Sequence, residues 1–177
     1  MCVIEKTPVI ETRRLALRAP EARDAARLSE LASDYDVAKM TLRMPHPYQV
    51  ADGLAFVGAV QAQDPRRAAT FVIDHEEAGP IGVIGLFEDA DPAPEVGYWI
   101  GRPFWGRGLA TEALEGALVW AKKAWKRRAL TAGHFTDNPA SGRVLEKAGF
   151  LYTGEVRRGF SKARGEWTDT RRMVWLA

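Results

Sequence analysis

Apolar and polar residues alternate along "RRLALRA", and this period of two predicts a strand over residues 13–19. The next stretch, "PEARDAARLSELAS", instead repeats its apolar residues at helical spacing after a proline, which predicts an amphipathic helix. Residues 34–65 contain the Pro-rich loop "MPHPYQ" between helical pieces, and Asp52 is expected to cap the helix "GLAFVGAVQAQ". The first third of the chain is therefore predicted to hold one strand followed by helices.

Strand patterns dominate the middle and the end of the chain. The runs "ATFVID" and "PIGVIGLFE", joined by "HEEAG", are typical of a hairpin, and "PEVGYWIG" is the next expected strand. A helix then runs to about Lys123, and a second helix, "NPASGRVLEKAG", lies between the strands "RRALTAGHF" and "FLYTGEV". A last strand is expected at "TDTRRMVWLA". Together these elements predict an α/β fold built on a mixed α+β sheet.

Length and composition narrow the class of protein. The 177 residues show no repeat or linker, which predicts a single domain over residues 1–177. The formal net charge of +2 is too small to indicate a nucleic-acid partner, and it does not repel an anionic ligand. The one cysteine, Cys2, excludes a disulfide framework, and His46, His75 and His134 lack metal-ligand spacing, so no metal is expected. With neither a signal peptide nor a membrane-spanning run in the sequence, the expected compartment is the cytoplasm.

The stretch "RPFWGRGLATEALEGALVWAKK" begins a helix on Gly106, Arg107 and Gly108, where no side chain can cap it. Backbone N–H groups at a helix start lack an intrahelical partner, and with the positive end of the helix dipole they form an anion site. Glycines there let a phosphate approach the main chain closely. A P-loop is excluded because Leu109 follows Gly108, and "GRGLAT" lacks the third glycine of a dinucleotide-binding turn. Taken alone, the segment is equally consistent with an ordinary tight turn.

A second helix start lies one strand further along the chain. In "NPASGRVLEKAGF", Asn138 is expected as the N-cap, Pro139 takes the first helical position and Gly149 fits the C-terminal stop. Helix formation explains each of these residues. It does not explain why this short helix is paired, across one strand, with a helix that begins on glycines.

Two segments, "EVGYWIGRPFWGRGLATEAL" and "NPASGRVLEKAGF", resemble the GNAT superfamily of acyl-CoA-dependent N-acetyltransferases. The likeness is closest to the Rim-type branch, whose named members acetylate the N-termini of ribosomal proteins. The stretches "ETRRLALRAPEARDAARL" and "GEWTDTRRMVWL" also fit, so the resemblance covers most of the chain. It implies a GNAT-like acyl-CoA N-acyltransferase fold: a twisted central sheet of about six to seven strands, splayed between "EVGYWIG" and "LTAGHFT" and flanked by helices.

The resemblance also implies that acetyl-CoA is the co-substrate. Its pantetheine arm is expected in the splay, against the strand edge near Trp99 and Ile100, and its pyrophosphate on the backbone amides of the glycine turn. The family's turn often begins with Gln or Arg; this chain has Trp105 there, which is expected to pack or to shape the acceptor side. The expected cofactor-binding residues are Trp99, Ile100, Gly106, Arg107, Gly108, Leu109, Ala110, Thr111, Asn138 and Arg143.

Three arginines are candidates for phosphate contacts. Arg107 is placed for a charge-assisted contact with the pyrophosphate, and Arg102 or Arg143 for a more distant phosphate. Taken singly, each is better explained as solvated surface. Asn138 is expected to hydrogen-bond the pantetheine or the adjacent strand, besides capping its helix.

Acetyl transfer requires a neutral amine and a hydrogen-bond donor for the thioester carbonyl oxygen. Glu95 is the expected base, directly or through water, although a solvated strand edge explains it equally well. Glu88 is the reserve candidate, and His134 ranks third because a single strand histidine is more often structural.

The departing thiolate also benefits from a proton. Many family members use a tyrosine of the last helix as the acid, but Leu145 occupies that place here. Ser141 is the expected substitute, and a role in the start of its helix explains it equally well. Tyr152 or a water molecule stays open as an alternative.

The predicted function is transfer of an acetyl group from acetyl-CoA to a primary amine, with the N-terminal amine of a protein or peptide as the leading acceptor. The alternatives are a small-molecule amine, such as an antibiotic or a polyamine, and a non-catalytic acyl-CoA-binding domain. No acidic run lies near the expected cleft, which disfavours polyamines. Neither a membrane nor a nucleic acid is expected as partner, because a solvated helix end explains the basic residues at 122–128. Association into a homodimer stays open.

Overall fold

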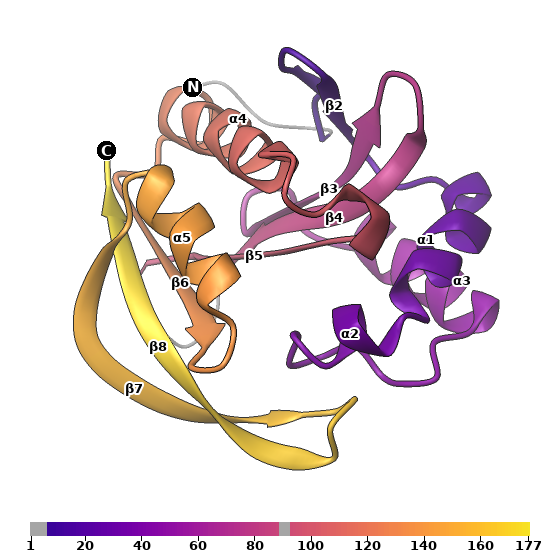
Figure 1. Ribbon diagram of the computed structural model, residues 1–177. Coiled ribbons are helices and arrows are strands. Elements are labelled where there is room, and N and C mark those ends of the chain that lie inside the picture. The colour runs from indigo at the N-terminus through magenta and orange to yellow at the C-terminus, as the bar shows by residue number, and fades with distance from the viewer. Residues whose placement is uncertain (1–6, 89–92) are drawn as a thin grey trace.

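One mixed sheet of eight strands organises the chain in the computed structural model, which describes residues 7–88 and 93–177 (Figure 1). The spatial order of the strands is β1-β2-β3-β4-β5-β6-β8-β7. Their bounds are β1 Ile10–Glu11, β2 Leu15–Arg18, β3 Ala68–His75, β4 Gly79–Phe87, β5 Glu95–Ile100, β6 Ala129–Phe135, β7 Leu151–Ser161 and β8 Glu166–Leu176.

Helices cover both faces of the sheet (Figure 1). One face carries α4 and α5, and the other carries α1, α2 and α3. Strand alternation serves both layers, since Phe71 and Ile73 of β3 belong to the core under α4 while Val72 packs with Leu28 of α1. The bounds are α1 Ala25–Ala32, α2 Tyr35–Ala38, α3 Val50–Gln61, α4 Leu109–Lys123 and α5 Pro139–Lys147, with 3₁₀ turns at Ala22–Asp24 and Arg102–Phe104.

The sheet opens between β5 and β6. All its other neighbours pair antiparallel, whereas these two strands run parallel and share only the pairs Glu95–Thr131 and Val96–Ala132. Beyond these pairs, β5 continues to Ile100 and β6 continues to Phe135, but the two strands no longer pair with each other. The predicted splay is therefore confirmed, and the gap has a closed end and an open mouth.

A long curved ribbon formed by β7 and β8 passes beside the mouth (Figure 1). Its tip is bonded to the loop after α2: Lys162 N donates to Leu42 O at 3.0 Å, and Ser161 Oγ donates to Thr41 O at 3.1 Å. The two halves of the sheet, parted in the middle, are thus joined again at their far end.

Most predicted elements are confirmed, including both helices that flank the splay. The count of six to seven strands was too low, because β1 has only two residues and such a strand shows no periodicity. Asp52 is not the cap of α3: Gln49 holds that position, and the Asp52 carboxylate accepts from Gln49 N at 2.8 Å. Cys2 lies outside the described residues.

Candidate functional site

The turn before α4 leaves its backbone open. Gly106 and Gly108 both have φ of +74°, in the left-handed region that favours glycine. A Cβ at Gly106 would meet no atom within 4 Å, and one at Gly108 would meet only Arg14 Nη2 at 3.8 Å. No side chain caps the helix. The first amides of α4 are therefore available to an anion, as the sequence predicts for residues 106–111.

A partly buried carboxylate, that of Glu112, holds this turn in place. Glu112, in the first turn of α4, accepts from Thr12 Oγ1 at 2.8 Å, from Arg14 N at 2.7 Å and from Arg14 Nε at 2.8 Å. Arg14 also donates through Nη1 to Arg107 O at 3.2 Å, which fixes that peptide group. Burial raises the pKa of Glu112, but the bonds from Thr12 and Arg14 outweigh it and leave the pKa below its usual range. Sequence patterns gave no signal for this contact, because Arg14 and Glu112 lie 98 residues apart.

Along the edge of β5 that faces the gap, the outward backbone groups are those of Tyr98 and Ile100. Pro94 O accepts from Thr131 N of β6, whereas Gly101 N donates to Ile81 O of β4. Backbone groups alternate between the two neighbours of a strand, so those of Trp99 point toward β4. Within the edge expected near Trp99 and Ile100, the backbone groups that face the gap are therefore those of Tyr98 and Ile100, while those of Trp99 face β4.

Trp105 occupies part of the same edge. Its indole Nε1 donates to Ile100 O at 2.6 Å, while nearly half of its side chain stays exposed. Of the edge groups, the Ile100 carbonyl is therefore engaged within the chain. The Trp99 side chain packs against the apolar clusters of α1 and α2 on the other face of the sheet.

The start of α5 faces β5 across the gap. Asn138 caps the helix as predicted, its Oδ1 accepting from Ser141 N at 3.2 Å. The Tyr98 hydroxyl donates to Ser141 O at 3.2 Å and lies 3.0 Å from Ser141 Oγ. Burial raises the pKa of Tyr98 to about 12, so this phenol keeps its proton at neutral pH. Sequence reasoning missed Tyr98, although it stands in the "GYWI" motif and its position in the strand directs it toward α5.

His134 and Tyr152 form a separate pair behind α5. The ring nitrogens of His134 lie 2.8 Å from Phe135 O and 3.0 Å from the Tyr152 hydroxyl. Gly142 packs directly on this pair, since a Cβ there would approach both side chains within 3 Å. Both nitrogens of His134 are thus committed to structural contacts.

Glu95 stands at the closed end of the gap, on the face of the sheet opposite α5. Its Oε2 accepts from Arg172 Nη2 of β8 at 2.7 Å, and the Arg172 side chain is buried. The reserve candidate, Glu88, is held by Arg67 at 3.0 Å and Arg127 at 2.8 Å. Hydrogen bonds from Arg67 and the charge of Arg127 hold the pKa of Glu88 below its usual range, which makes it a weak base.

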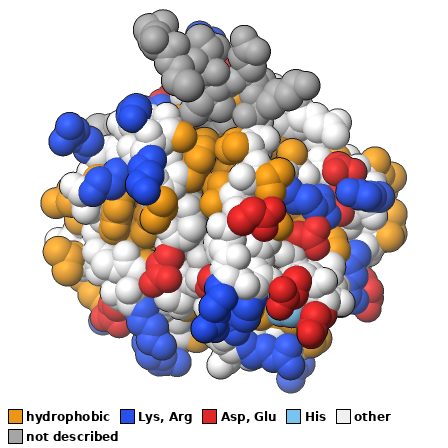
Figure 2. All heavy atoms as spheres, turned by 90° about the horizontal axis from the view of Figure 1, so that it is seen from above, with side chains coloured by type: hydrophobic (Ala, Val, Ile, Leu, Met, Phe, Trp, Pro, Cys, Tyr) orange, Lys and Arg blue, Asp and Glu red, His pale blue; other side chains and the backbone are white. Residues whose placement is uncertain are grey.

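Several expected cationic contacts are engaged elsewhere. Arg102 pairs with Asp34 and Asp36 beside α2, the nearer at 3.1 Å, while Arg143 is exposed on α5. Within the basic stretch 122–128, Arg127 stacks on Trp125 at 4.3 Å besides pairing with Glu88. Figure 2 shows basic side chains gathered at one edge of the face seen from above, with acidic and basic side chains interspersed over the rest of it.

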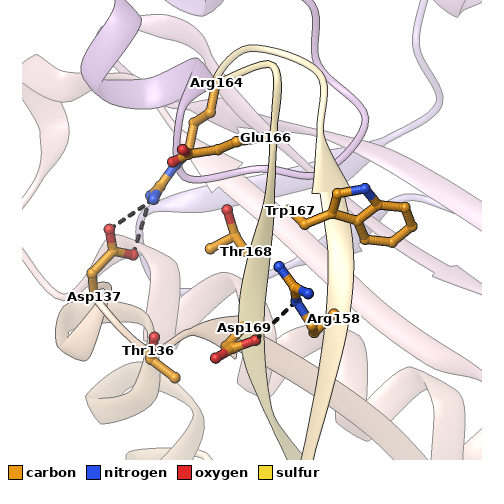
Figure 3. Close-up of a pocket in the computed structure, with 8 residues that line it drawn as sticks. All are labelled: Thr136, Asp137, Arg158, Arg164, Glu166, Trp167, Thr168 and Asp169. Atoms are coloured by element: carbon orange, nitrogen blue, oxygen red, sulfur yellow. Dashed lines mark hydrogen bonds and ion pairs between the residues drawn. The ribbon is translucent and has the colours of Figure 1, made fainter.

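A cavity of about 490 Å³ lies beside the mouth of the gap, between the end of β6 and the β7–β8 ribbon (Figure 3). On one side Arg164 faces Asp137, which it contacts at 2.7 and 3.1 Å; Thr168 points in from β8 (Figure 3). Arg164 also donates to Lys39 O at 2.6 Å. The lining residues are Thr136, Asp137, Arg158, Arg164, Glu166, Trp167, Thr168 and Asp169.

Comparisons with known proteins agree with this geometry. Residues 14–151 match the family model described as "Acetyltransferase (GNAT) domain". An uncharacterized N-acetyltransferase, p20 of Bacillus licheniformis, is 25% identical over 162 residues, covering 89% of this chain and 90% of its own.

Two solved structures illustrate the likeness in fold. RimL, a ribosomal-protein alpha-N-acetyltransferase in complex with coenzyme A, superposes with a TM-score of 0.81 at 18% identity, covering 96% of this chain and 98% of its own. Spermidine N-acetyltransferase from Vibrio cholerae, in complex with CoA and spermine, gives 0.76 at 21% identity, covering 92% and 95%.

The parted sheet, the glycine turn and the family match define an acyl-CoA-dependent transferase. The chain belongs to the GNAT family and is an N-acetyltransferase that uses acetyl-CoA, as the resemblance implied. In the described parts of the chain no helix is both long and apolar enough to cross a membrane. Nor do the described side chains gather into a group that would hold a metal ion.

Gly108→Ala tests the turn as a phosphate site. We expect the left-handed backbone to cost roughly 1–2 kcal/mol of stability, and acetyl-CoA affinity to fall roughly tenfold, about 1.4 kcal/mol, as the amides move. Isothermal calorimetry and urea unfolding measure the two effects. Gly79→Ala is the matched control, because Gly79 has φ of +69°, equally open surroundings and a place in the β3–β4 hairpin. Equal losses of affinity in both variants would make the turn purely structural.

Proposed function

We propose that the acceptor is the N-terminal amine of a protein or peptide. The observation that carries this is the pairing of Glu95 with Arg172 at 2.7 Å, because the proposed base is then a carboxylate shared with an arginine, and no surplus of negative charge remains between these two side chains at the closed end of the gap. An α-amino group has a pKa near ~8, against ~10.4 for lysine, and so needs the least help to lose its proton. RimL, which shares the fold, is a ribosomal-protein alpha-N-acetyltransferase.

Acetyl-CoA supplies the acetyl group, and the chain offers it two kinds of contact. The open amides from Gly106 to Thr111 suit the pyrophosphate, with Leu109 buried beneath to anchor the turn. The free edge groups, which are the N–H and C=O of Tyr98 and the N–H of Ile100, suit the amides of the pantetheine arm. Asn138 and Arg143, at and beyond the start of α5, complete the proposed set.

Glu95 is the proposed acceptor of the amine proton, directly or through water. It lies in the strand that forms one wall of the gap, on the face opposite Ser141. This separation lets the amine lose its proton on one side while the sulfur gains one on the other.

Ser141 is the proposed donor of a proton to the sulfur, with Tyr98 holding its hydroxyl. The Tyr98 phenol has one proton, which it donates either to Ser141 O or to Ser141 Oγ. When it donates to Oγ, the serine hydroxyl can turn its own proton toward the gap. Tyr98 thus supplies a phenol beside Ser141, whereas α5 itself has the buried Leu145 where many family members have a tyrosine.

A polyamine acceptor is the competing reading, because spermidine N-acetyltransferase shares this fold. Two carboxylates beside the gap are paired, Glu95 with Arg172 and Asp137 with Arg164, and a polycation prefers several unpaired carboxylates. These pairs favour the N-terminal amine.

The first experiment measures free thiol release from acetyl-CoA with three acceptor classes: N-terminally free peptides, polyamines and lysine side chains in N-terminally blocked peptides. We expect release with the free peptides and little with the others. Preferential turnover of spermidine would contradict this proposal and indicate a small-molecule amine as the acceptor. Saturable binding of acetyl-CoA with no release on any amine would leave a non-catalytic acyl-CoA-binding domain.

Glu95→Gln is expected to lower kcat/KM roughly 100-fold. The loss should be greatest at low pH, where the amine is mostly protonated and its deprotonation limits the rate. Glu88→Gln is the control and should follow the wild-type pH–rate profile, because Glu88 bonds to Arg67 and Arg127 instead. A Glu95→Gln profile parallel to wild type at every pH would remove Glu95 from this role.

Ser141→Ala is expected to lower kcat roughly 100-fold and Tyr98→Phe roughly tenfold, with the KM for acetyl-CoA unchanged in both. Because Tyr98 acts through Ser141, the double variant should be no slower than Ser141→Ala alone. Tyr152→Phe is the matched control, since its hydroxyl bonds to His134. Additive losses in the double variant, or a larger loss in Tyr152→Phe, would contradict this assignment.

A further inference from the structure

Two threonine hydroxyls on β8 are buried without a hydrogen-bond partner among the described residues. Thr168 is 9% exposed and Thr170 6%, and the Oγ1 atom of each makes no hydrogen bond. A buried hydroxyl without a partner costs stability, so folded proteins keep few of them without a reason. Thr168 lines the cavity beside the mouth of the gap, whereas Thr170, two residues along the same face of the strand, does not.

The cavity adjoins a strand edge that has lost its neighbour. Thr136 N donates to Asp169 O at 3.0 Å, and no later backbone hydrogen bond joins these two segments in the described structure. Backbone groups alternate along a strand, so those of Trp167 point to the same side of β8 as those of Asp169. At Trp167, β6 no longer lies along that side. A free strand edge is where an extended peptide adds to a sheet.

The charged side chains that line the cavity, together with the exposed indole of Trp167, suit a basic side chain. Three carboxylates, those of Asp137, Glu166 and Asp169, face two guanidinium groups, those of Arg158 and Arg164, which leaves a formal charge of −1. Glu166 forms no ion pair with the rest of the described chain, while Asp137 and Asp169 each contact an arginine. The indole of Trp167, 60% exposed, offers an aromatic face to a cation.

The cavity also has the right place and size. Thr136 and Asp137 directly precede Asn138, which caps the helix that carries Ser141. Its volume of about 490 Å³ accommodates a few residues of an extended chain.

From these observations we infer that the cavity binds the residues following the acetylated amine, in a peptide acceptor that carries a basic side chain near its N-terminus. The inference rests on the proposed function. The peptide backbone pairs with the free edge at Trp167, the Thr168 hydroxyl turns to bond with it, and the basic side chain lies between Glu166 and the Trp167 indole.

Thr168→Val and Thr170→Val separate a binding role from a structural one. Valine keeps the shape and removes the hydroxyl, so we expect both variants to melt above wild type. Only Thr168→Val should raise the KM for a pentapeptide with arginine at its third position, by roughly three- to tenfold. Acetylation of an amino-acid amide, which is too short to reach the cavity, should be unchanged in both.

Measurements on the unaltered protein supply an independent check. Calorimetry with the protein–CoA complex should show tighter binding of the arginine pentapeptide than of two analogues, one with glutamate in place of arginine and one N-methylated at its second and third amides. This readout does not depend on turnover and stands even if a valine variant fails to fold.

The outcomes are distinct. Equal peptide KM values for both valine variants, or equal affinities for the three peptides, would overturn the binding site. Turnover of polyamines or amino-acid amides without peptide binding would overturn it while leaving N-acetylation intact. Tight arginine-dependent binding with no thiol release on any amine would support the site and contradict the proposed function.

Discussion

The parting of β5 from β6 is the constraint on which the rest of this structure depends. Two residue pairs hold these strands together, and beyond them the edge of β5 has lost the neighbour that every backbone amide in a sheet needs. Such an edge is costly unless something satisfies it, and the described residues supply only one group, the Trp105 indole on Ile100 O. The remaining edge groups are left for a ligand with amides of its own, such as the proposed pantetheine arm.

The gap keeps a defined width because side chains bridge it at three levels. Glu95 of β5 meets Arg172 of β8 at the closed end, and Tyr98 meets Ser141 at the start of α5. At the mouth, Arg164 joins the ribbon tip to Lys39 O. Each bridge links the N-terminal half of the sheet to the C-terminal half, so the two halves act as one body although their backbones have separated. In the proposed function, the same three contacts border the acceptor amine, the thioester and the body of the acceptor.

Local patterns in the sequence predicted the parts that are locally determined. The glycines of the turn, the cap at Asn138 and the alternating strands follow from backbone conformation and periodicity. The bridges do not, because they depend on which residues meet after folding: Arg14 with Glu112, or Tyr98 with Ser141. That Tyr98 rather than Trp99 turns its backbone groups to the gap has the same origin, since the side to which a strand residue points its amide is set by its pairing register. The family resemblance supplied the splay, which neither composition nor periodicity indicates.

The bridges also limit the chemistry that the site performs. Arg172 engages the Glu95 carboxylate, so the site offers no isolated base for an amine that binds its proton tightly. Burial raises the pKa of Tyr98 to about 12, which keeps this phenol a hydrogen-bond donor at neutral pH. Because both groups also hold the gap, we expect much of the rate to come from the alignment of amine and thioester, with the proposed proton transfers by Glu95 and Ser141 adding to it. Such a site favours an acceptor that arrives nearly neutral and is held by contacts away from its amine.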